Sequence, residues 1–124
     1  MSFTFTKIER LCGVKAIDEL YASGKSKTAF PIKLIYKKSE FESPFPVRVL
    51  FVVPKKKHKR ANKRNFIKRR MREVYRLNKH VLYDAVAAHK LDIMFICLTS
   101  DELEYVEIEK SMLQLMHTLA NQIL

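Results

Sequence analysis

Apolar and polar residues alternate in two stretches of the chain, and a third stretch is apolar apart from Asp92. A period of two predicts a strand with one face in the core, and an unbroken apolar run predicts a buried strand. The three predicted strands cover residues 30–36, 47–53 and 91–98. Pro31 lacks a donor for a sheet, so the first strand is expected to begin at an edge or a bulge. The second, nearly all apolar, is expected to be central.

The alternation in the first strand predicts which of its side chains share a face of the sheet. Phe30, Ile32, Leu34 and Tyr36 share one face, while Lys33 and Ile35 point to the other, wetter face. A polar connection is expected before this strand, at residues 25–28, and a hairpin loop after it, at residues 37–46.

Apolar residues spaced three and four apart predict the helices. They are expected at residues 6–11, 14–23, from 61 or 62 through a long basic stretch, 81–88 and 105–124. Thr6 and Glu9 have the spacing of a capping box, and Gly24 is placed to follow the second helix. The order of elements predicts one α+β domain over residues 1–124, built as a two-layer sandwich of a sheet and helices.

Positive charge is concentrated in one segment. Residues 55–79 hold 13 of the 24 Lys and Arg residues and one of the 13 acidic residues, a net charge of +12 against +11 for the whole chain. A basic block of this density predicts a surface that meets a polyanion, with nucleic acid favoured over an anionic membrane surface. Two other interpretations of the block are a solvated helical face and a localisation tract. Both are weaker, because the block continues into an amphipathic helix between strands.

Groups that would support catalysis or metal binding are scattered. The four His residues do not accompany a Ser or Cys nucleophile in a known motif, and the two Gly residues cannot form a phosphate-binding loop. Cys12 and Cys97 lie far apart and are expected to be reduced thiols, with Cys97 in the core. The N-terminus has no signal-peptide pattern and no apolar run approaches the roughly 20 residues that span a bilayer, so a cytoplasmic location is expected.

The types of residue in the basic block favour RNA. Arg side chains form bidentate contacts with phosphates, and Asn65 can contact a ribose or a base edge. The block follows a strand and lacks a helix-turn-helix partner, a context that suits structured RNA better than the DNA major groove. Two alternatives stay open at this point: a DNA-binding regulator, and a structural RNA-binding protein of ribosomal type without a processing role.

The spacing within the block resembles the signature of the bacterial ribonuclease P protein component. In that family a strand ends in V-[SP]-K-K, a loop leads to an Ala, and R-N-R-x-K-R-x-x-R-E follows on a helix. The matching residues here are VPKK at positions 53–56, Ala61, Arg64, Asn65, Lys68, Arg69, Arg72 and Glu73. Three positions depart from the motif: Phe66 replaces its third-position Arg, Lys59 a Gly and Asn62 a Val. The resemblance covers nearly the whole chain.

The resemblance implies a fold and a role. The fold is an α/β sandwich with a sheet of about four strands, helices on one face and a left-handed β-α-β crossover, like domain 2 of ribosomal protein S5. The partner RNA cleaves precursor tRNA with its own Mg²⁺ ions, so the protein is the non-catalytic subunit of an endoribonuclease and binds no cofactor itself. The implied partners are the ribonuclease P RNA and the 5′ leader of precursor tRNA, without a membrane or an obligate protein partner.

The resemblance also implies two binding surfaces. The residues expected to bind the catalytic RNA are Lys55, Lys56, Arg64, Asn65, Lys68, Arg69 and Arg72. The residues expected to line a cleft for the leader, between the first helix and the sheet, are Ile17, Tyr21, Tyr36, Phe30 and Lys33.

Overall fold

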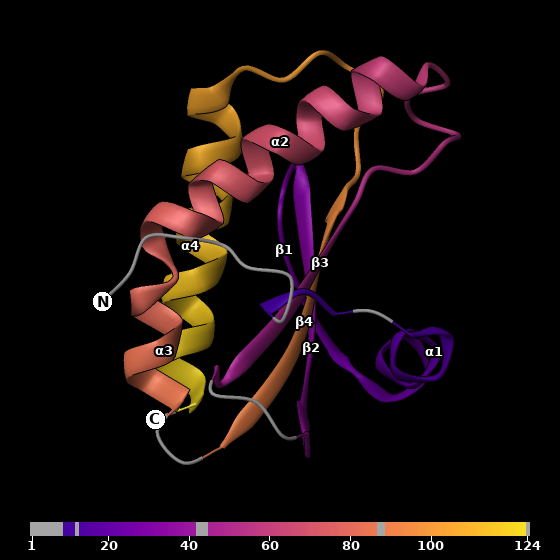
Figure 1. The fold of residues 1–124 in the computed structure, drawn as a ribbon. Helices are drawn as coiled ribbons and strands as arrows, with labels where there is room; N and C mark the ends of the chain where they lie inside the picture. Colours follow the sequence, from indigo (N-terminus) through magenta and orange to yellow (C-terminus); the bar gives the residue numbers. More distant parts are fainter. Residues whose placement is uncertain (1–8, 12, 42–44, 87–88, 124) are drawn as a thin grey trace.

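The computed structural model describes residues 9–11, 13–41, 45–86 and 89–123 and contains four helices and four strands in that part of the chain (Figure 1). Their order is α1 (Val14–Ser23), β1 (Lys25–Ala29), β2 (Ile32–Ser39), β3 (Val47–Val52), α2 (Ala61–Asn78), α3 (His80–Val86), β4 (Lys90–Cys97) and α4 (Tyr105–Ile123). The helices predicted near residues 14, 61, 81 and 105 and the three predicted strands are all confirmed, with shifts of a few residues at their ends.

The strands form one mixed sheet in the order β1-β2-β4-β3. β2 pairs antiparallel with both β1 and β4, whereas β3 and β4 are parallel. Phe95 in the middle of β4 lies between Leu34 of β2 and Phe51 of β3. β4, which is apolar from Ile93 to Cys97, is therefore an inner strand, as expected for a strand buried on both faces.

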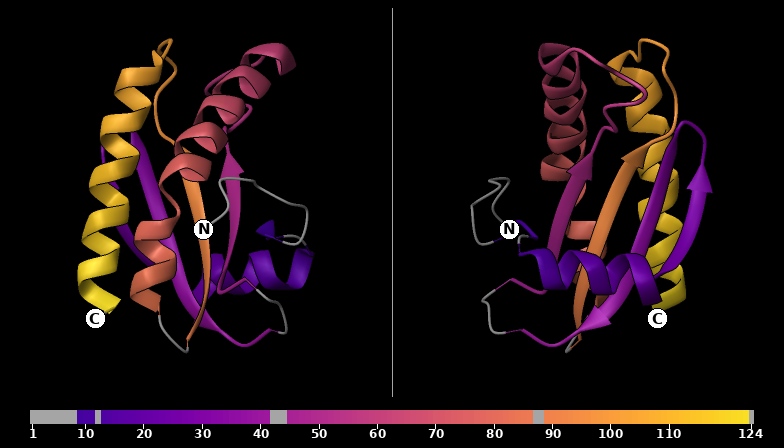
Figure 2. Two further views of the ribbon diagram at one scale, coloured as in Figure 1. Left: turned by 60° about the vertical axis from the view of Figure 1, so that its left-hand side comes forward. Right: turned by 90° about the vertical axis from the view of Figure 1, so that its right-hand side faces the viewer.

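Helices α2, α3 and α4 cover one face of the sheet, and α1 lies across the other (Figure 1). In the right-hand view of Figure 2, β3 and β4 both point upward, β4 lies to the right of β3, and α2 and α3 return on the far side of the sheet. This path is a left-handed crossover, as the family resemblance implied. Most β-α-β crossovers are right-handed, so the general rule would have predicted the opposite hand.

The larger core lies between the sheet and the three helices. Ile67, Met71 and Val74 of α2 are buried there, which confirms the apolar stripe predicted for this helix. Phe51 stacks on Phe95 at 5.8 Å between ring centroids, and Tyr75 meets both rings edge-on. Such aromatic pairs contribute about 0.5–1.5 kcal/mol each beyond the area they bury, so this cluster holds the buried side of the basic helix rigidly on the sheet.

Four predictions about the strands are wrong. Residues 25–29 form the edge strand β1, although the sequence KSKTA has no apolar alternation. Phe30 and Pro31 form the turn between β1 and β2, so β2 is an inner strand and does not begin at an edge. The segment after β2 is not a hairpin loop, because β4 lies between β2 and β3. β3, which was expected to be central because its sequence is nearly all apolar, is consequently an edge strand.

The outer edge of β3 is partly covered by the start of the described chain. Arg10 forms a parallel bridge with Val49, and the Leu11 amide donates to the Val49 carbonyl at 2.8 Å. Residues 10 and 11 are thus extended, whereas Glu9 lies in a 3₁₀ turn, so the helical turn expected at residues 6–11 does not continue beyond Glu9. Thr6 and Cys12 lie outside the described residues. This pairing explains how an apolar strand can stand at an edge without exposing its full backbone.

Gly24 follows α1 as predicted, but for a different reason. Its φ of −73° lies outside the left-handed region, and its amide donates to the Leu20 carbonyl at 2.9 Å. A Cβ at this position would overlap the Leu20 carbonyl oxygen and approach the Ile35 side chain to 2.7 Å. Glycine is therefore required by the close contact of α1 with β2, which seats the helix on the sheet.

Candidate nucleic-acid interface

The basic loop before α2 is held in one conformation by buried and backbone contacts. The His58 ring is 5% exposed and lies 2.9 Å from the Thr99 carbonyl through Nε2. Arg64 donates from one guanidinium nitrogen to the carbonyls of His58 and Lys59, at 3.0 and 2.8 Å. These contacts leave a ring of exposed cations on an ordered support: Lys55, Lys56, Lys57, Lys59 and Arg60.

A row of cations continues from the loop along α2. Lys68 and Arg72 are half-buried at successive turns, and Asn65 and Arg69 are exposed beside them. Partial burial, with the charges of Arg10 and Arg69, lowers the pKa of the Arg72 guanidinium. Like charges gathered in this way repel one another, and a phosphate placed among them would relieve that repulsion. Arg10 was not expected at this surface, because nothing in the sequence indicates that residues 10 and 11 run beside β3.

Several cations of the basic block do not belong to this row. Lys79 is 2% exposed, and its ammonium is 2.6 Å from the Glu9 carboxylate. Arg76 is paired with Glu73 at 2.6 Å. Lys63 is paired with Glu102, and Arg70 donates to the Leu103 carbonyl. The surface that can meet a polyanion is therefore narrower than the segment 55–79 suggested.

The seven residues predicted to bind RNA lie on the basic loop and on α2, but they differ in what they can do. Lys55, Lys56, Asn65 and Arg69 are exposed, whereas Lys68 and Arg72 are half-buried. Arg64 is also half-buried and already uses one nitrogen to fix the loop. We call this surface, with Arg10, the α2 docking face.

A second surface lies on the opposite side of the sheet, beside α1. Ile17 is half-buried against a small core with Leu20 and Ile35, while Tyr21 is 57% exposed on α1. Lys33 is half-buried on the face of β2 that also carries Ile35. Half-buried apolar side chains continue along this face of β3 and β4: Leu50, Val52 and Leu98.

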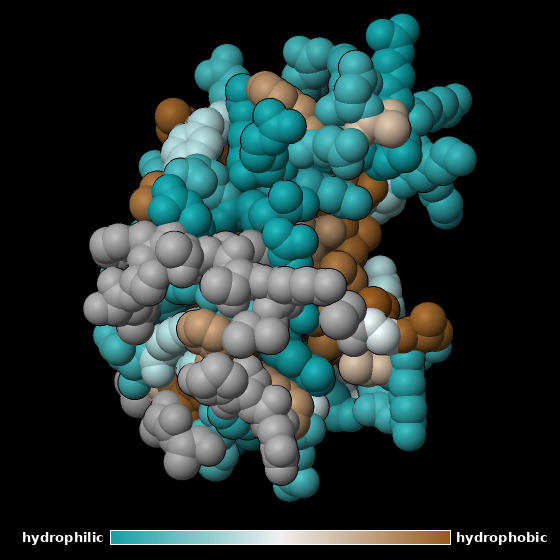
Figure 3. Space-filling view, in the orientation of Figure 1, coloured by the Kyte–Doolittle hydropathy of each residue, from teal (hydrophilic) through white to brown (hydrophobic). Residues whose placement is uncertain are grey.

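The space-filling view shows how the two surfaces meet (Figure 3). The hydrophilic upper part of the molecule, which contains the start of α2 and the basic loop, overhangs a hollow whose wall is hydrophobic. We call this side of the sheet, beside α1, the α1 cleft. Ile17, Leu50, Val52 and Leu98 belong to its apolar cluster, and we assign Tyr21 of α1 and Lys33 of β2 to it because of the elements that carry them. An extended polyanion with unstacked bases could place its phosphates near the loop and its bases against the apolar wall.

Tyr36 and Phe30, predicted to line the same cleft, lie elsewhere. The Tyr36 ring packs on the core under α4, and its hydroxyl donates to Gln122 at 2.9 Å. Phe30 is 71% exposed in the turn between β1 and β2, beside the first turns of α4. The parity of β2 places Tyr36 on the face opposite Ile35, and the alternation in the sequence already carried that signal.

The described residues include no group of three or more His, Cys, Asp or Glu side chains placed to hold a metal ion. Cys97 is buried, as predicted, and burial raises the pKa of its thiol. No helix in the described ranges is long and apolar enough to cross a membrane. The chemistry that this site offers is the binding of phosphates and the stacking or packing of bases.

Comparison with known proteins gives one consistent family. The family model described as Ribonuclease P matches residues 5–120. The ribonuclease P protein component of Porphyromonas gingivalis is 31% identical over 113 residues, covering 90% of this chain and 82% of that protein. The ribonuclease P protein component of Chlorobaculum tepidum is 45% identical over 78 residues, covering 60% of this chain and 51% of the relative.

Solved structures agree in fold. The RNase P protein from Thermotoga maritima superposes with a TM-score of 0.72 at 24% identity, covering 88% of this chain and 96% of that one. The RNase P protein of Staphylococcus aureus gives a TM-score of 0.71 at 20% identity, with 90% and 94% covered.

Proposed function

Because the chain belongs to the ribonuclease P protein family, we propose that it docks on the catalytic RNA through the α2 docking face and holds the 5′ leader of precursor tRNA in the α1 cleft. The chain is the protein subunit of an endoribonuclease that gives tRNA its mature 5′ end, and the RNA subunit performs the catalysis. What the protein contributes is charge, shape and a second binding surface.

The observation that carries the docking proposal is the crowding of Arg10, Arg69 and Arg72. Partial burial, together with the neighbouring charges of Arg10 and Arg69, lowers the pKa of the Arg72 guanidinium. The rigid loop adds exposed Lys side chains at the start of the same helix. Six to ten phosphate contacts of this kind give an affinity that falls by about 10³–10⁵ between 50 and 200 mM salt.

The proposal for the leader rests on the composition of the α1 cleft. A single-stranded leader presents base faces that pack on apolar and aromatic side chains, and each stacked base contributes roughly 1–3 kcal/mol. Tyr21 offers an exposed ring, Ile17 an apolar contact and Lys33 a charge for the backbone. Tyr36 and Phe30 are left out of the proposed cleft because of where they lie in the fold.

Two further parts of the proposal concern conditions. Mg²⁺ is the metal that we propose for the RNA-catalysed step, since it stabilises the charge that develops on a reacting phosphate. We also place the reaction in the cytoplasm.

Reconstitution tests the function: the protein with its cognate RNA should cleave precursor tRNA at the mature 5′ end at a lower Mg²⁺ concentration than the RNA alone needs. Cleavage of that substrate by the RNA-free protein, abolished by EDTA, would contradict it.

A further inference from the structure

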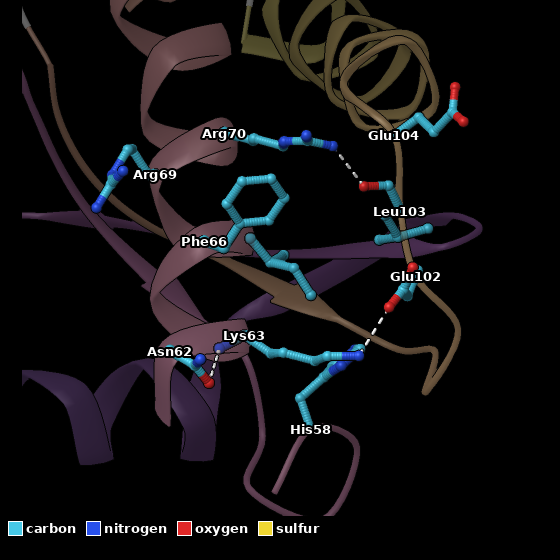
Figure 4. Close-up of a pocket in the computed structure, with 10 residues that line it drawn as sticks. His58, Asn62, Lys63, Phe66, Arg69, Arg70, Glu102, Leu103 and Glu104 are labelled. Atoms are coloured by element: carbon cyan, nitrogen blue, oxygen red, sulfur yellow. Dashed lines mark hydrogen bonds and ion pairs between the residues drawn. The ribbon is translucent and has the colours of Figure 1, made fainter. Parts of the chain in front are cut away.

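A pocket on the other side of α2 belongs neither to the α2 docking face, apart from Arg69 on its rim, nor to the α1 cleft. It lies between the first three turns of α2 and the segment that leads into α4, and its volume is about 710 Å³ (Figure 4). That volume is within the range of about 300–1,000 Å³ typical of small-ligand sites. Its apolar lining comes from Phe66, Ile67 and Leu103.

Phe66 is the unusual member of this lining, because it is 48% exposed on a helix crowded with cations. The Arg70 guanidinium carbon lies 4.0 Å from the centroid of the Phe66 ring. Arg70 is itself fixed, since it donates to the Leu103 carbonyl at 2.7 Å. The two side chains thus form a preorganised flat platform, with part of the aromatic ring left open to the pocket (Figure 4).

The charges around the platform favour a ligand that carries phosphate. Lys63 neutralises Glu102 at 2.7 Å, and the other charged Arg and Glu side chains of the lining are Arg69, Arg70 and one exposed carboxylate, Glu104. Arg69 also belongs to the α2 docking face, so the pocket is continuous with that surface. A ligand chain bound along the docking face can therefore reach the platform without leaving the protein.

We propose that this pocket binds one unpaired nucleotide of the ribonuclease P RNA, its base stacked on Phe66 and its phosphate contacting Arg69. The inference rests on the proposed docking of the RNA along α2 and adds to it a subsite for a base. Nucleobases stack on exposed aromatic rings whatever their sequence, and RNA-binding proteins select bases that project from loops and bulges. A free aromatic molecule lacks the phosphate for Arg69, and an acidic peptide lacks the planar ring for Phe66.

Fluorescence can test the stacking directly, because the chain contains no Trp. Phe66→Trp introduces a single indole into the pocket, and stacking of a base quenches such a fluorophore. Leu77→Trp is the matched control: Leu77 is 38% exposed, eleven residues further along α2 and hence on the same side of the helix, outside the pocket. The probes are the cognate ribonuclease P RNA, a single-stranded oligoadenylate and a blunt RNA duplex of equal charge.

Quenching of the Phe66→Trp protein by the cognate RNA and the oligoadenylate, but not by the duplex, is the expected result. The Leu77→Trp protein should show no comparable quenching. Phe66→Leu should weaken binding of the cognate RNA by about fivefold to a hundredfold without a change in salt dependence, because no charge is removed. Phe66→Tyr, which keeps a ring, should retain most of the affinity.

Two results would overturn the inference. One is saturating binding of the RNA to Phe66→Trp protein without quenching, and the other is equal quenching by the duplex or of the Leu77→Trp protein. Either result leaves the proposed function standing if the same proteins still support cleavage of precursor tRNA by the RNA. Failure of the unsubstituted protein to bind the RNA would instead contradict the proposed function. Thermal unfolding checks that each variant is folded, as the exposure of both positions predicts.

Discussion

The Lys79 ammonium lies 2.6 Å from the Glu9 carboxylate, and neither side chain reaches solvent. The Tyr83 hydroxyl donates to the same carboxylate oxygen at 2.8 Å. The last cation of the basic block therefore ties the start of the chain to the end of α2. Arg10 directly follows Glu9 in the chain, so the Lys79–Glu9 ion pair also sets where Arg10 lies beside Arg72.

Removing one partner of this pair should strongly destabilise the fold. Lys79→Met leaves the Glu9 carboxylate buried without its cation, a change that costs about 3–5 kcal/mol in the free energy of unfolding. Urea denaturation measures the loss. The control is Arg76→Met, which breaks the solvent-accessible pair with Glu73 and should cost much less stability, because water screens that pair. Equal losses in the free energy of unfolding of the two variants would show that the buried pair stabilises the fold no more than the pair of Arg76 with Glu73.

Arg69→Ala should weaken binding of the cognate RNA and reduce the slope of log K against log salt by about 0.7–0.9, because one phosphate contact is lost. The folded protein should keep its stability, since Arg69 is exposed. Filter binding over a series of salt concentrations measures both quantities. Arg76→Met is the control, because Arg76 is paired with Glu73 outside the α2 docking face: it should leave the slope unchanged, and a reduced slope there would contradict the exclusion of Arg76 from that face.

Arg64→Ala should act in two ways, because this side chain supports the loop as well as carrying charge. We expect a flatter salt slope, as for Arg69→Ala, together with faster hydrogen exchange at the His58 amide, which donates to the Pro54 carbonyl. Arg64→Lys is the matched control: it keeps the charge, and hence most of the salt slope, but loses the two-carbonyl contact. Unchanged hydrogen exchange at the His58 amide in the Arg64→Ala variant would show that Arg64 does not hold the loop in place.

The fold could be predicted from the sequence where periodicity was strong. The bounds of α1 and the start of α2 follow from apolar spacing and from Gly24, and the buried face of α2 followed from Ile67, Met71 and Val74. Strand β1 was missed because an edge strand with polar residues on both faces has no apolar pattern. The position of β3 at the edge of the sheet could not be predicted either. The contacts at this edge, including the pairing with residues 10 and 11, join segments that are distant in the sequence. The handedness of the crossover came from family resemblance alone.

The candidate site was predictable to a similar degree. Four cations of the α2 docking face, Arg64, Lys68, Arg69 and Arg72, share a helix, so their common side follows from the 3.6-residue repeat. The α1 cleft joins elements distant in sequence, and its members Leu50, Val52 and Leu98 look like ordinary core residues in the sequence. The burial of Lys79 depends on Glu9, seventy residues away, and no local pattern indicates it.

Cys97 should react slowly with iodoacetamide in the native protein. Burial raises the pKa of its thiol, and the thiolate is the reacting species, so the native labelling rate at pH 8 should be more than about tenfold below the rate in urea. The native rate should also rise with pH at higher values than the unfolded rate does. Peptide mapping reports Cys97 separately from Cys12. Equal rates in the two states would contradict the buried position of Cys97.

Site-specific photo-crosslinking tests the central claim most directly, because it asks which RNA each surface touches. Benzoylphenylalanine placed at Lys68, Tyr21 or Tyr36 would be irradiated in the complete assembly of protein, catalytic RNA and precursor tRNA carrying a labelled 5′ leader. Position 68 should label the catalytic RNA, position 21 the leader, and position 36, under α4, neither. Labelling of the leader from position 36 but not from position 21 would contradict the account.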